Sequence, residues 1–279
     1  MSDIPPLVDT RWLSALGTRL DRVPMRIVDS RWSATGGSGR ARYDEGHIPG
    51  AVFVDLDRDL SRPGGPGRHP FPSEEAFART LARLGIGPRT HVVVYDDSTG
   101  SVAARLWFML RAHGHEAASV LDGGFKAWTE AGLPVTKDVP RIAPAALMPL
   151  ELDRSRLADR AQVENRGRSV LLDARAPERY RGETEPLDPR AGHIPGARNA
   201  PYMQNLGPGG RFRPPEELRH LYQAYGDDVI CSCGSGVTAC HDILALELAG
   251  LPPARLYVGS WSDWCSDPDR PIATGPEPG

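Results

Sequence analysis

Hydrophobic residues along the chain follow two patterns, and each pattern predicts one kind of element. Short runs rich in Val, Ile and Leu, such as residues 91–97 and 228–233, predict buried strands. Apolar residues at helical spacing predict helices at residues 74–84, 102–112, 215–225 and 237–249. Strands and helices that alternate in this way indicate an α/β fold, with a mainly parallel sheet and helices on both faces.

The two halves of the chain carry the same short segments in the same order. Residues 46–51 read GHIPGA, and residues 192–197 repeat them letter for letter. Three further pairs of segments correspond: 26–31 with 170–175, 91–97 with 228–233, and 120–128 with 257–264. Such repetition predicts two copies of one domain. We expect domains at residues 6–134 and 151–274, joined by a Pro- and Ala-rich linker at 135–150.

Composition limits the classes of protein that fit this chain. Its 279 residues are 40% hydrophobic and 25% charged, which is typical of a soluble globular protein large enough for two cores. A net charge of −3 gives no reason to expect nucleic acid or a membrane surface as partner. Residues 1–6 lack the basic and apolar regions of a signal peptide, so we expect a cytoplasmic protein. We also expect it to be a monomer or a weak dimer.

The four cysteines, Cys231, Cys233, Cys240 and Cys265, all lie in the last fifth of the chain. A secreted disulfide framework would spread its cysteines along a shorter chain, and a structural zinc site would need paired C-x-x-C or C…H arms. We therefore expect no metal. Under oxidation, a disulfide of Cys233 with Cys231 or with Cys240 remains an alternative.

Cys233 stands where a predicted strand ends and a short loop opens into a predicted helix. Gly234 and Gly236 permit a tight loop whose backbone N–H groups face the sulfur. Such N–H groups and the positive end of a helix favour a thiolate over a thiol. A buried cysteine is more often a small core residue, but the two glycines and the position after the strand favour a nucleophile here.

The first copy has Asp97 where the second has Cys233, by our alignment of the repeat. A carboxylate does not attack sulfur usefully, so only the second copy is expected to carry out thiol chemistry. The first domain is then inactive, and it serves as a scaffold or contributes residues to a shared cleft.

These segments resemble the tandem rhodanese-type sulfurtransferases. The resemblance rests on both GHIPGA turns, the LDGG segment at 121–124, the GSW…W segment at 259–264 and the loop CGSGVT at 233–238. The loop is similar to that of the 3-mercaptopyruvate branch. The resemblance implies ping-pong sulfur transfer through a persulfide on Cys233, from a small donor to cyanide, a small thiol or a reduced thioredoxin-like protein. It implies no cofactor.

The same resemblance implies the donor-binding residues. Two arginines that hold the substrate in the mercaptopyruvate branch correspond to Arg179 and Arg190, and guanidinium groups suit carboxylate binding. The loop residues that contact the donor are Gly234, Gly236, Val237 and Thr238. A solvated surface arginine is the alternative for either arginine.

A proton-handling set is also implied by the resemblance. It consists of Ser235 with His69 and Asp57 from the first half of the chain, and Asp55 competes with Asp57 for the acidic position. A surface histidine is the alternative for His69. His47, His193 and His241 are expected to be structural, the first two because both copies contain them.

Three other functions compete with mercaptopyruvate use. Thiosulfate is a dianion, and the lack of basic residues at Gly234 and Ser235 disfavours it as the best donor. A related cysteine phosphatase would need an arginine six residues after the cysteine, where this chain has Ala239. A non-catalytic binding module is disfavoured by the intact Cys233 and its glycines.

Overall fold

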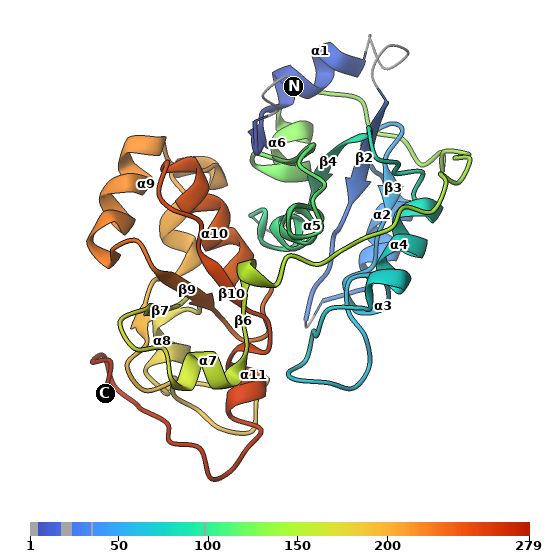
Figure 1. The fold of residues 1–279 in the computed structure, drawn as a ribbon. Coiled ribbons are helices and arrows are strands. Elements are labelled where there is room, and N and C mark those ends of the chain that lie inside the picture. Colours follow the sequence, from blue (N-terminus) through green and yellow to red (C-terminus); the bar gives the residue numbers. More distant parts are fainter. Residues whose placement is uncertain (1–4, 18–23, 35, 98) are drawn as a thin grey trace. The chain divides into compact units, whose positions relative to one another are not determined.

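The computed structural model describes residues 5–17, 24–34, 36–97 and 99–279, and it divides into two compact units (Figure 1). The first unit comprises Met1–Arg62, Pro72–Asp153 and Gly209–Arg211, and the second comprises Pro63–Phe71, Arg154–Pro208 and Phe212–Gly279. Residues 63–71 therefore belong to the second unit, although elements of the first unit precede and follow them in the chain. The first four residues, used above for the expected location, lie outside the described residues.

The first unit is built on a five-stranded sheet. Its elements in chain order are β1 (Leu7–Val8), α1 (Thr10–Gly17), β2 (Met25–Asp29), α2 (Gly39–Glu45), β3 (Val52–Phe53), α3 (Leu56–Asp59), α4 (Glu74–Arg83), β4 (His91–Tyr95), α5 (Ser101–Ala112), β5 (Ala118–Leu121) and α6 (Gly124–Glu130). The strand order is β1-β5-β4-β2-β3, and all neighbouring strands are parallel.

The second half of the chain repeats this arrangement. Its elements are η1 (Arg154–Arg156), β6 (Leu157–Ala158), α7 (Arg160–Glu164), β7 (Val170–Asp173), α8 (Pro177–Tyr180), β8 (Arg198–Asn199), η2 (Tyr202–Asn205), η3 (Pro208–Gly210), α9 (Pro215–Tyr222), η4 (Gln223–Tyr225), β9 (Val229–Ser232), α10 (Ala239–Leu248), β10 (Arg255–Tyr257) and α11 (Ser260–Trp264). The parallel order β6-β10-β9-β7-β8 matches that of the first sheet strand for strand. The predicted α/β fold in two copies is confirmed.

Both central strands are buried along their whole length. All five residues of β4 and all four residues of β9 are buried, which requires cover on both faces of each sheet. In the first unit, Val93 and Tyr95 of β4 pack with Trp128 of α6. In the second, Ile230 of β9 packs with Trp261 of α11. Each unit therefore has its own hydrophobic core.

The starts of the helices differ most from the sequence prediction at the cysteine loop. Three of the four expected helices, represented by α4, α5 and α9, begin within one residue of the predicted start. The fourth, α10, begins at Ala239 rather than at residue 237. Gly236 has a φ of +74°, which a right-handed helix does not permit, so the loop continues to Thr238 before the helix starts.

Each unit holds its GHIPGA turn with the same tyrosine–histidine stack. His47 stacks on Tyr43 with ring centroids 3.9 Å apart, and its Nδ1 lies 2.9 Å from the Tyr43 carbonyl oxygen. His193 stacks on Tyr180 at 3.7 Å, and its Nδ1 lies 2.8 Å from the Tyr180 carbonyl oxygen. His241 is also buried, and it stacks on a phenylalanine ring. These contacts support the structural roles expected of the three histidines.

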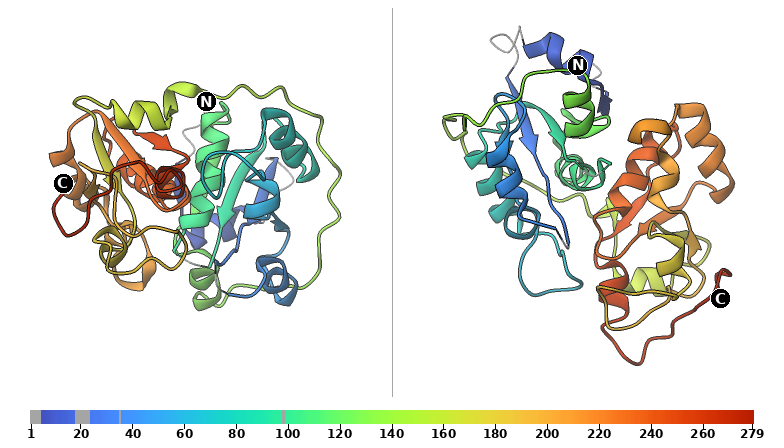
Figure 2. Two further views of the ribbon diagram at one scale, coloured as in Figure 1. Left: turned by 90° about the horizontal axis from the view of Figure 1, so that it is seen from below. Right: turned by 180° about the vertical axis from the view of Figure 1, so that it is seen from behind.

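Residues 137–153 form an extended segment without helix or strand, which Figure 2 shows as a long stretch of plain chain. Among the described residues, no helix is both long enough and apolar enough to span a bilayer. Within the same residues, no group of three or more His, Cys, Asp and Glu side chains is arranged to hold a metal ion.

Candidate active site

Cys233 is the first residue after β9, at the carboxyl end of the central strand of the second sheet. The residue is only 2% exposed, and its Sγ accepts a hydrogen bond from the Gly236 backbone N–H at 3.1 Å. A backbone N–H directed at sulfur stabilises negative charge on it. The loop thus directs a backbone N–H at the cysteine sulfur, as the sequence predicts.

The cysteine loop is fixed from behind by the start of α11. The Cys233 N–H donates to the Ser260 hydroxyl at 3.0 Å. In return, the N–H groups of Trp261 and Ser262 donate to the carbonyls of Cys233 and Gly234 at 3.0 and 2.9 Å. Ser260 has a φ of +54°, a conformation that costs a non-glycine residue energy and is often found at functional sites. These bonds preorganise the loop before any substrate arrives.

Gly236 leaves no room for a side chain. A Cβ at this position would lie 2.5 Å from the Val258 carbonyl oxygen, and the positive φ adds strain for any other residue. We therefore predict that Gly236→Ala lowers the free energy of unfolding by about 1–3 kcal/mol, which denaturant titration will measure. Gly209→Ala is the matched control, because Gly209 has a similar φ of +81° with open space around its Cβ position. Equal losses in the two variants would show that backbone strain alone, and not the contact with Val258, restricts residue 236.

The strand pairing in the two sheets shows that our alignment of Asp97 with Cys233 was wrong by one residue. Asp29 pairs with Tyr95 in the first sheet, whereas Asp173 pairs with Ser232 in the second. The residues that follow, Asp96 and Cys233, are therefore equivalent. In agreement, the Phe125 N–H donates to the Asp96 carbonyl as Trp261 donates to Cys233. Asp96, and not Asp97 as we expected, occupies the position of the cysteine in the first copy.

The Asp96 carboxylate fills the amide cradle of the first unit. It accepts hydrogen bonds from the backbone N–H groups of Gly100, Val102 and Ala103 at 2.8–2.9 Å. Asp97 forms an ion pair with Arg42 at 2.7 Å, and burial raises the pKa of its carboxyl group although Arg42 acts to lower it. The loop after β4 thus directs backbone N–H groups at a carboxylate, and the loop after β9 directs one at a cysteine sulfur.

Arg175 supplies a fixed positive charge near Cys233. Its guanidinium binds the Asp173 carboxylate through Nε and Nη2 and donates to the Gly192 carbonyl at 2.7 Å. Burial acts to lower the pKa of Arg175, but the charges of Asp173, Glu185 and Cys233 outweigh it, so the pKa is raised. Arg175 therefore keeps its proton, and it interacts electrostatically with Cys233.

Ser235 and His69 lie together, although 166 residues separate them in the sequence. His69 Nδ1 is 2.7 Å from Ser235 Oγ, and both residues are buried. Both belong to the second unit, because residues 63–71 are part of it. The structure therefore brings together two members of the predicted proton-handling set.

The two candidate aspartates lie in the first unit, at the start of α3. The Asp55 carboxylate caps this helix by accepting the N–H groups of Asp57 and Arg58. The Asp57 carboxylate accepts a hydrogen bond from the Trp32 indole at 2.7 Å. Because the cap already uses the Asp55 carboxylate, Asp57 remains the better candidate of the two. Its catalytic role stays a prediction.

Arg179 and Arg190 lie in different surroundings. Arg179 Nη1 and Nη2 are 3.4 and 3.5 Å from the position that a Cβ of residue 234 would occupy, and Nη2 donates to Glu185 at 2.7 Å. Arg190 Nη1 instead donates to the carbonyls of Asp267 and Arg270, both at 3.1 Å. Arg179 thus faces the cysteine loop, as expected of a donor-binding group. For Arg190, substrate binding stays a prediction that these contacts do not support.

The remaining loop residues continue toward α10. Val237 is buried, and Thr238 occupies the N-cap position of the helix without a side-chain cap. All four cysteines are free thiols. Burial raises the pKa of Cys265 to about 11 and raises that of Cys231 well above the usual range. Cys240 donates its thiol hydrogen to the Gly236 carbonyl at 3.3 Å.

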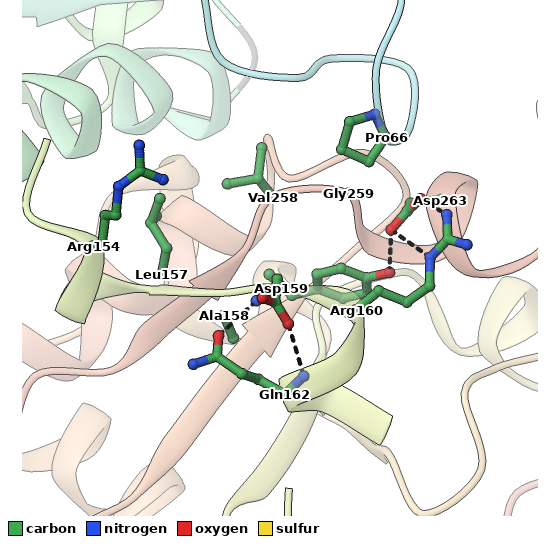
Figure 3. Close-up of a pocket in the computed structure, with 11 residues that line it drawn as sticks. Pro66, Arg154, Leu157, Ala158, Asp159, Arg160, Gln162, Val258, Gly259 and Asp263 are labelled. Atoms are coloured by element: carbon green, nitrogen blue, oxygen red, sulfur yellow. Dashed lines mark hydrogen bonds and ion pairs between the residues drawn. The ribbon is translucent and has the colours of Figure 1, made fainter. Parts of the chain in front are cut away.

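A cavity of about 550 Å³ lies beside α11, bordered by Val258 and Gly259 (Figure 3). Three of its charged groups, Asp159, Arg160 and Asp263, already have partners within the unit. Asp263 accepts hydrogen bonds from the Tyr257 hydroxyl and from Arg160, and Asp159 forms a capping box with Gln162. Cys233 does not line this cavity. The cavity lacks a nucleophile, and its polar contacts support α11 and, through it, the cysteine loop.

Comparison with known proteins places these features in a wider group. A model of the rhodanese-like domain matches residues 13–131 and 157–267. The chain is 45% identical over 273 residues to a probable 3-mercaptopyruvate sulfurtransferase of Pseudomonas aeruginosa, covering 93% of this chain and 96% of that protein. It is 43% identical over 281 residues to a thiosulfate sulfurtransferase of Cricetulus griseus, covering 92% and 91%. Names of both kinds thus occur among its relatives.

Solved structures show the same similarity. The Escherichia coli protein SseA, described as a 3-mercaptopyruvate sulfotransferase with the rhodanese fold, superimposes with a TM-score of 0.81 at 32% identity, covering 92% of this chain and 99% of that one. The 3-mercaptopyruvate sulfurtransferase from Leishmania major gives a TM-score of 0.83 at 31% identity, with 95% and 75% covered. The similarity spans both copies of the domain.

Proposed function

Because this chain belongs to the rhodanese-domain sulfurtransferases, we propose that it moves sulfur from 3-mercaptopyruvate to a thiol or cyanide through a persulfide on Cys233. One observation carries the proposal: the Cys233 sulfur accepts the Gly236 N–H in a loop whose counterpart holds the Asp96 carboxylate. A loop architecture that holds a carboxylate in one copy is suited to a thiolate and a persulfide in the other.

In the first half-reaction, the Cys233 thiolate attacks the thiol sulfur of 3-mercaptopyruvate. A sulfur–sulfur bond forms, the carbon–sulfur bond breaks, and its electron pair goes to the carbon as an enolate. The proton of the donor thiol must then reach that carbon, which gives pyruvate and a persulfide anion. Ser235 and His69, 2.7 Å apart, are suited to carry this proton, with Asp57 as the proposed third member.

The negative charge of 3-mercaptopyruvate suits the positively charged side chain beside the cysteine loop. Its carboxylate suits the Arg179 guanidinium, which lies next to Gly234 and is held by Glu185. Gly234 has no side chain beside the Arg179 guanidinium, which leaves space there for a small donor. Val237 and Thr238 complete the loop that would surround the donor. Arg190 would take part only if its guanidinium left the two carbonyls that it binds here.

In the second half-reaction, an acceptor attacks the outer sulfur of the persulfide. Cyanide would leave as thiocyanate, and a thiolate would leave as a new persulfide, while Cys233 regains its thiolate. No step needs an organic cofactor or a metal. A small thiol and a reduced thioredoxin-like protein are the acceptors we propose. The four free cysteines fit reducing surroundings, in agreement with the cytoplasmic location that we propose.

Comparison of the two donors tests this proposal. We predict that kcat/KM for 3-mercaptopyruvate exceeds that for thiosulfate at least about tenfold, a difference of about 1.4 kcal/mol in transition-state stabilisation. Arg179→Ala should remove most of this preference, whereas Arg213→Ala, at an exposed ion pair with Glu217, should preserve it. Arg190→Ala in the same assay tests the second arginine. Equal efficiency with both donors in the wild type would contradict the donor assignment, and a higher kcat/KM for thiosulfate would favour thiosulfate as the donor.

A further inference from the structure

A second guanidinium lies beside the cysteine loop, and it comes from residues 63–71. Around the position that a Cβ of residue 234 would occupy, the three nearest heavy atoms are all guanidinium nitrogens. They are Arg68 Nη2 at 3.0 Å and the two terminal nitrogens of Arg179 at 3.4 and 3.5 Å. The space directly above Gly234 is therefore bordered by positive charge from two residues.

Arg68 is held in this position by its backbone and by a buried acid. The Arg68 N–H donates to the Ser262 hydroxyl at 3.0 Å, so the chain is attached to α11 just before the side chain extends. Gly67, with a φ of +78°, passes so close to α11 that a Cβ would lie 2.5 Å from the Gly259 carbonyl oxygen. The guanidinium forms an ion pair with Asp188, whose side chain is 3% exposed.

Asp188 links the two guanidiniums. It binds Arg68 through Oδ1, and its Oδ2 lies 3.5 Å from Arg179 Nη2. Arg68 remains 30% exposed and Arg179 19%, so both guanidiniums keep access to a small anion. Among the described residues, no hydrogen-bond partner is present for the buried Nε of Arg179, so this guanidinium retains an unused donor. Two anchored cations with accessible faces form a better anion site than one.

We propose that Arg68 is a donor-binding residue. Its guanidinium lies where a side chain at position 234 would otherwise extend, and its positive charge favours dianionic sulfur donors such as thiosulfate. The inference rests on the proposed persulfide at Cys233. In the step concerned, the Cys233 thiolate attacks the outer sulfur of thiosulfate, the sulfur–sulfur bond of the donor breaks, and sulfite leaves with the electron pair. Arg68 and Arg179 would bind the sulfonate oxygens during this step.

The charge of the donor provides the test. Thiosulfate is a dianion, whereas methanethiosulfonate transfers its sulfur by the same reaction, releases methanesulfinate and is a monoanion. Coulomb energy is proportional to the donor charge, so removal of one cation costs a dianion about twice as much free energy as a monoanion. With cyanide as acceptor, Arg68→Gln should lower kcat/KM about threefold for methanethiosulfonate and about tenfold for thiosulfate.

Three further variants separate charge from structure. Arg68→Lys keeps the charge and should restore the ratio of the two donors to within about twofold of the wild type. Gly234→Ala keeps Arg68 but places a methyl group 3.0 Å from Arg68 Nη2, so the guanidinium must move slightly away; residue 234 has no positive φ, so the methyl group brings no backbone strain. It should shift the ratio in the same direction as Arg68→Gln, by a smaller factor. Arg255→Gln, at an ion pair with Asp228 with 26% of the arginine exposed, is the matched control and should leave both rates unchanged.

An equal fall with both donors in Arg68→Gln, or no fall with thiosulfate, would overturn the inference. If Arg68→Gln did not fold, Gly234→Ala would decide the question by the same ratio. Failure of the proposed function would give a different experimental result from failure of this inference. A wild type that used 3-mercaptopyruvate poorly would contradict that donor, while the ratio of the two sulfonate donors would still report on Arg68.

Discussion

Replacement of Cys233 by Ser should abolish sulfur transfer from every donor while leaving the fold intact. A serine hydroxyl is far less acidic than a thiol and cannot form a persulfide, so the Gly236 N–H would have no sulfur anion to stabilise. We expect turnover to fall by at least about three orders of magnitude. The measurement is thiocyanate formation with cyanide, together with the mass of the protein after exposure to donor alone, which should rise by one sulfur atom only in the wild type.

Cys265→Ser is the control for this loss. Cys265 is equally buried in the second unit, and burial raises the pKa of its thiol to about 11, so it is not a thiolate at neutral pH. The control should therefore retain full turnover and the mass increase. Thiocyanate formation that persisted in Cys233→Ser would assign the nucleophile to another cysteine.

Replacement of His69 by Ala should separate the two donors. Mercaptopyruvate leaves as a carbanion equivalent that needs a proton, whereas thiosulfate leaves as sulfite, which needs none. Loss of a proton carrier typically costs a reaction about 10²–10⁴-fold. We expect kcat/KM for 3-mercaptopyruvate to fall about 100-fold or more and that for thiosulfate to fall much less. Ser235→Ala should show the same selectivity, because the hydroxyl lies 2.7 Å from the imidazole.

His220→Ala, an exposed histidine on α9 of the same unit, should change neither rate. If His69→Ala lowered both donors by the same factor, His69 would act on the loop as a whole and not on the proton. Asp57→Asn extends the test to the third proposed member. A smaller loss, confined to the same donor, would support a relay in which the aspartate orients the imidazole.

Features that depend on local pattern could be predicted from the sequence. The alternation of strands and helices indicated the sheets, and the repeated GHIPGA turns indicated two copies. The glycines beside Cys233 indicated a tight loop, and the structure directs a backbone N–H at the sulfur. Each of these signals lies within about ten residues of chain, where backbone geometry and hydrophobic period determine the outcome.

The remaining features depend on register and on contacts between distant residues. Asp96 and Asp97 are chemically alike, so only the pairing of Tyr95 with Asp29 shows which of them is equivalent to the cysteine. The position of Arg68 depends on Asp188, 120 residues further along the chain. Apart from Gly67, nothing in the local sequence around Arg68 distinguishes it from a solvated arginine. Gly67 is the one local signal, since a tight turn there brings the next residue against α11.

Residues 63–71 connect the second unit to the first half of the chain. By its contacts this segment belongs to the second unit, yet it is encoded in the middle of the first half. A chain that began at residue 151 would keep the sulfur and its amide loop but would lose both Arg68 and His69. Although the first copy contains no cysteine, its deletion would remove two residues that we propose as part of the site. The second unit thus depends on a segment of the first half for two of its candidate site residues, and expression of residues 151–279 alone would test what that segment contributes.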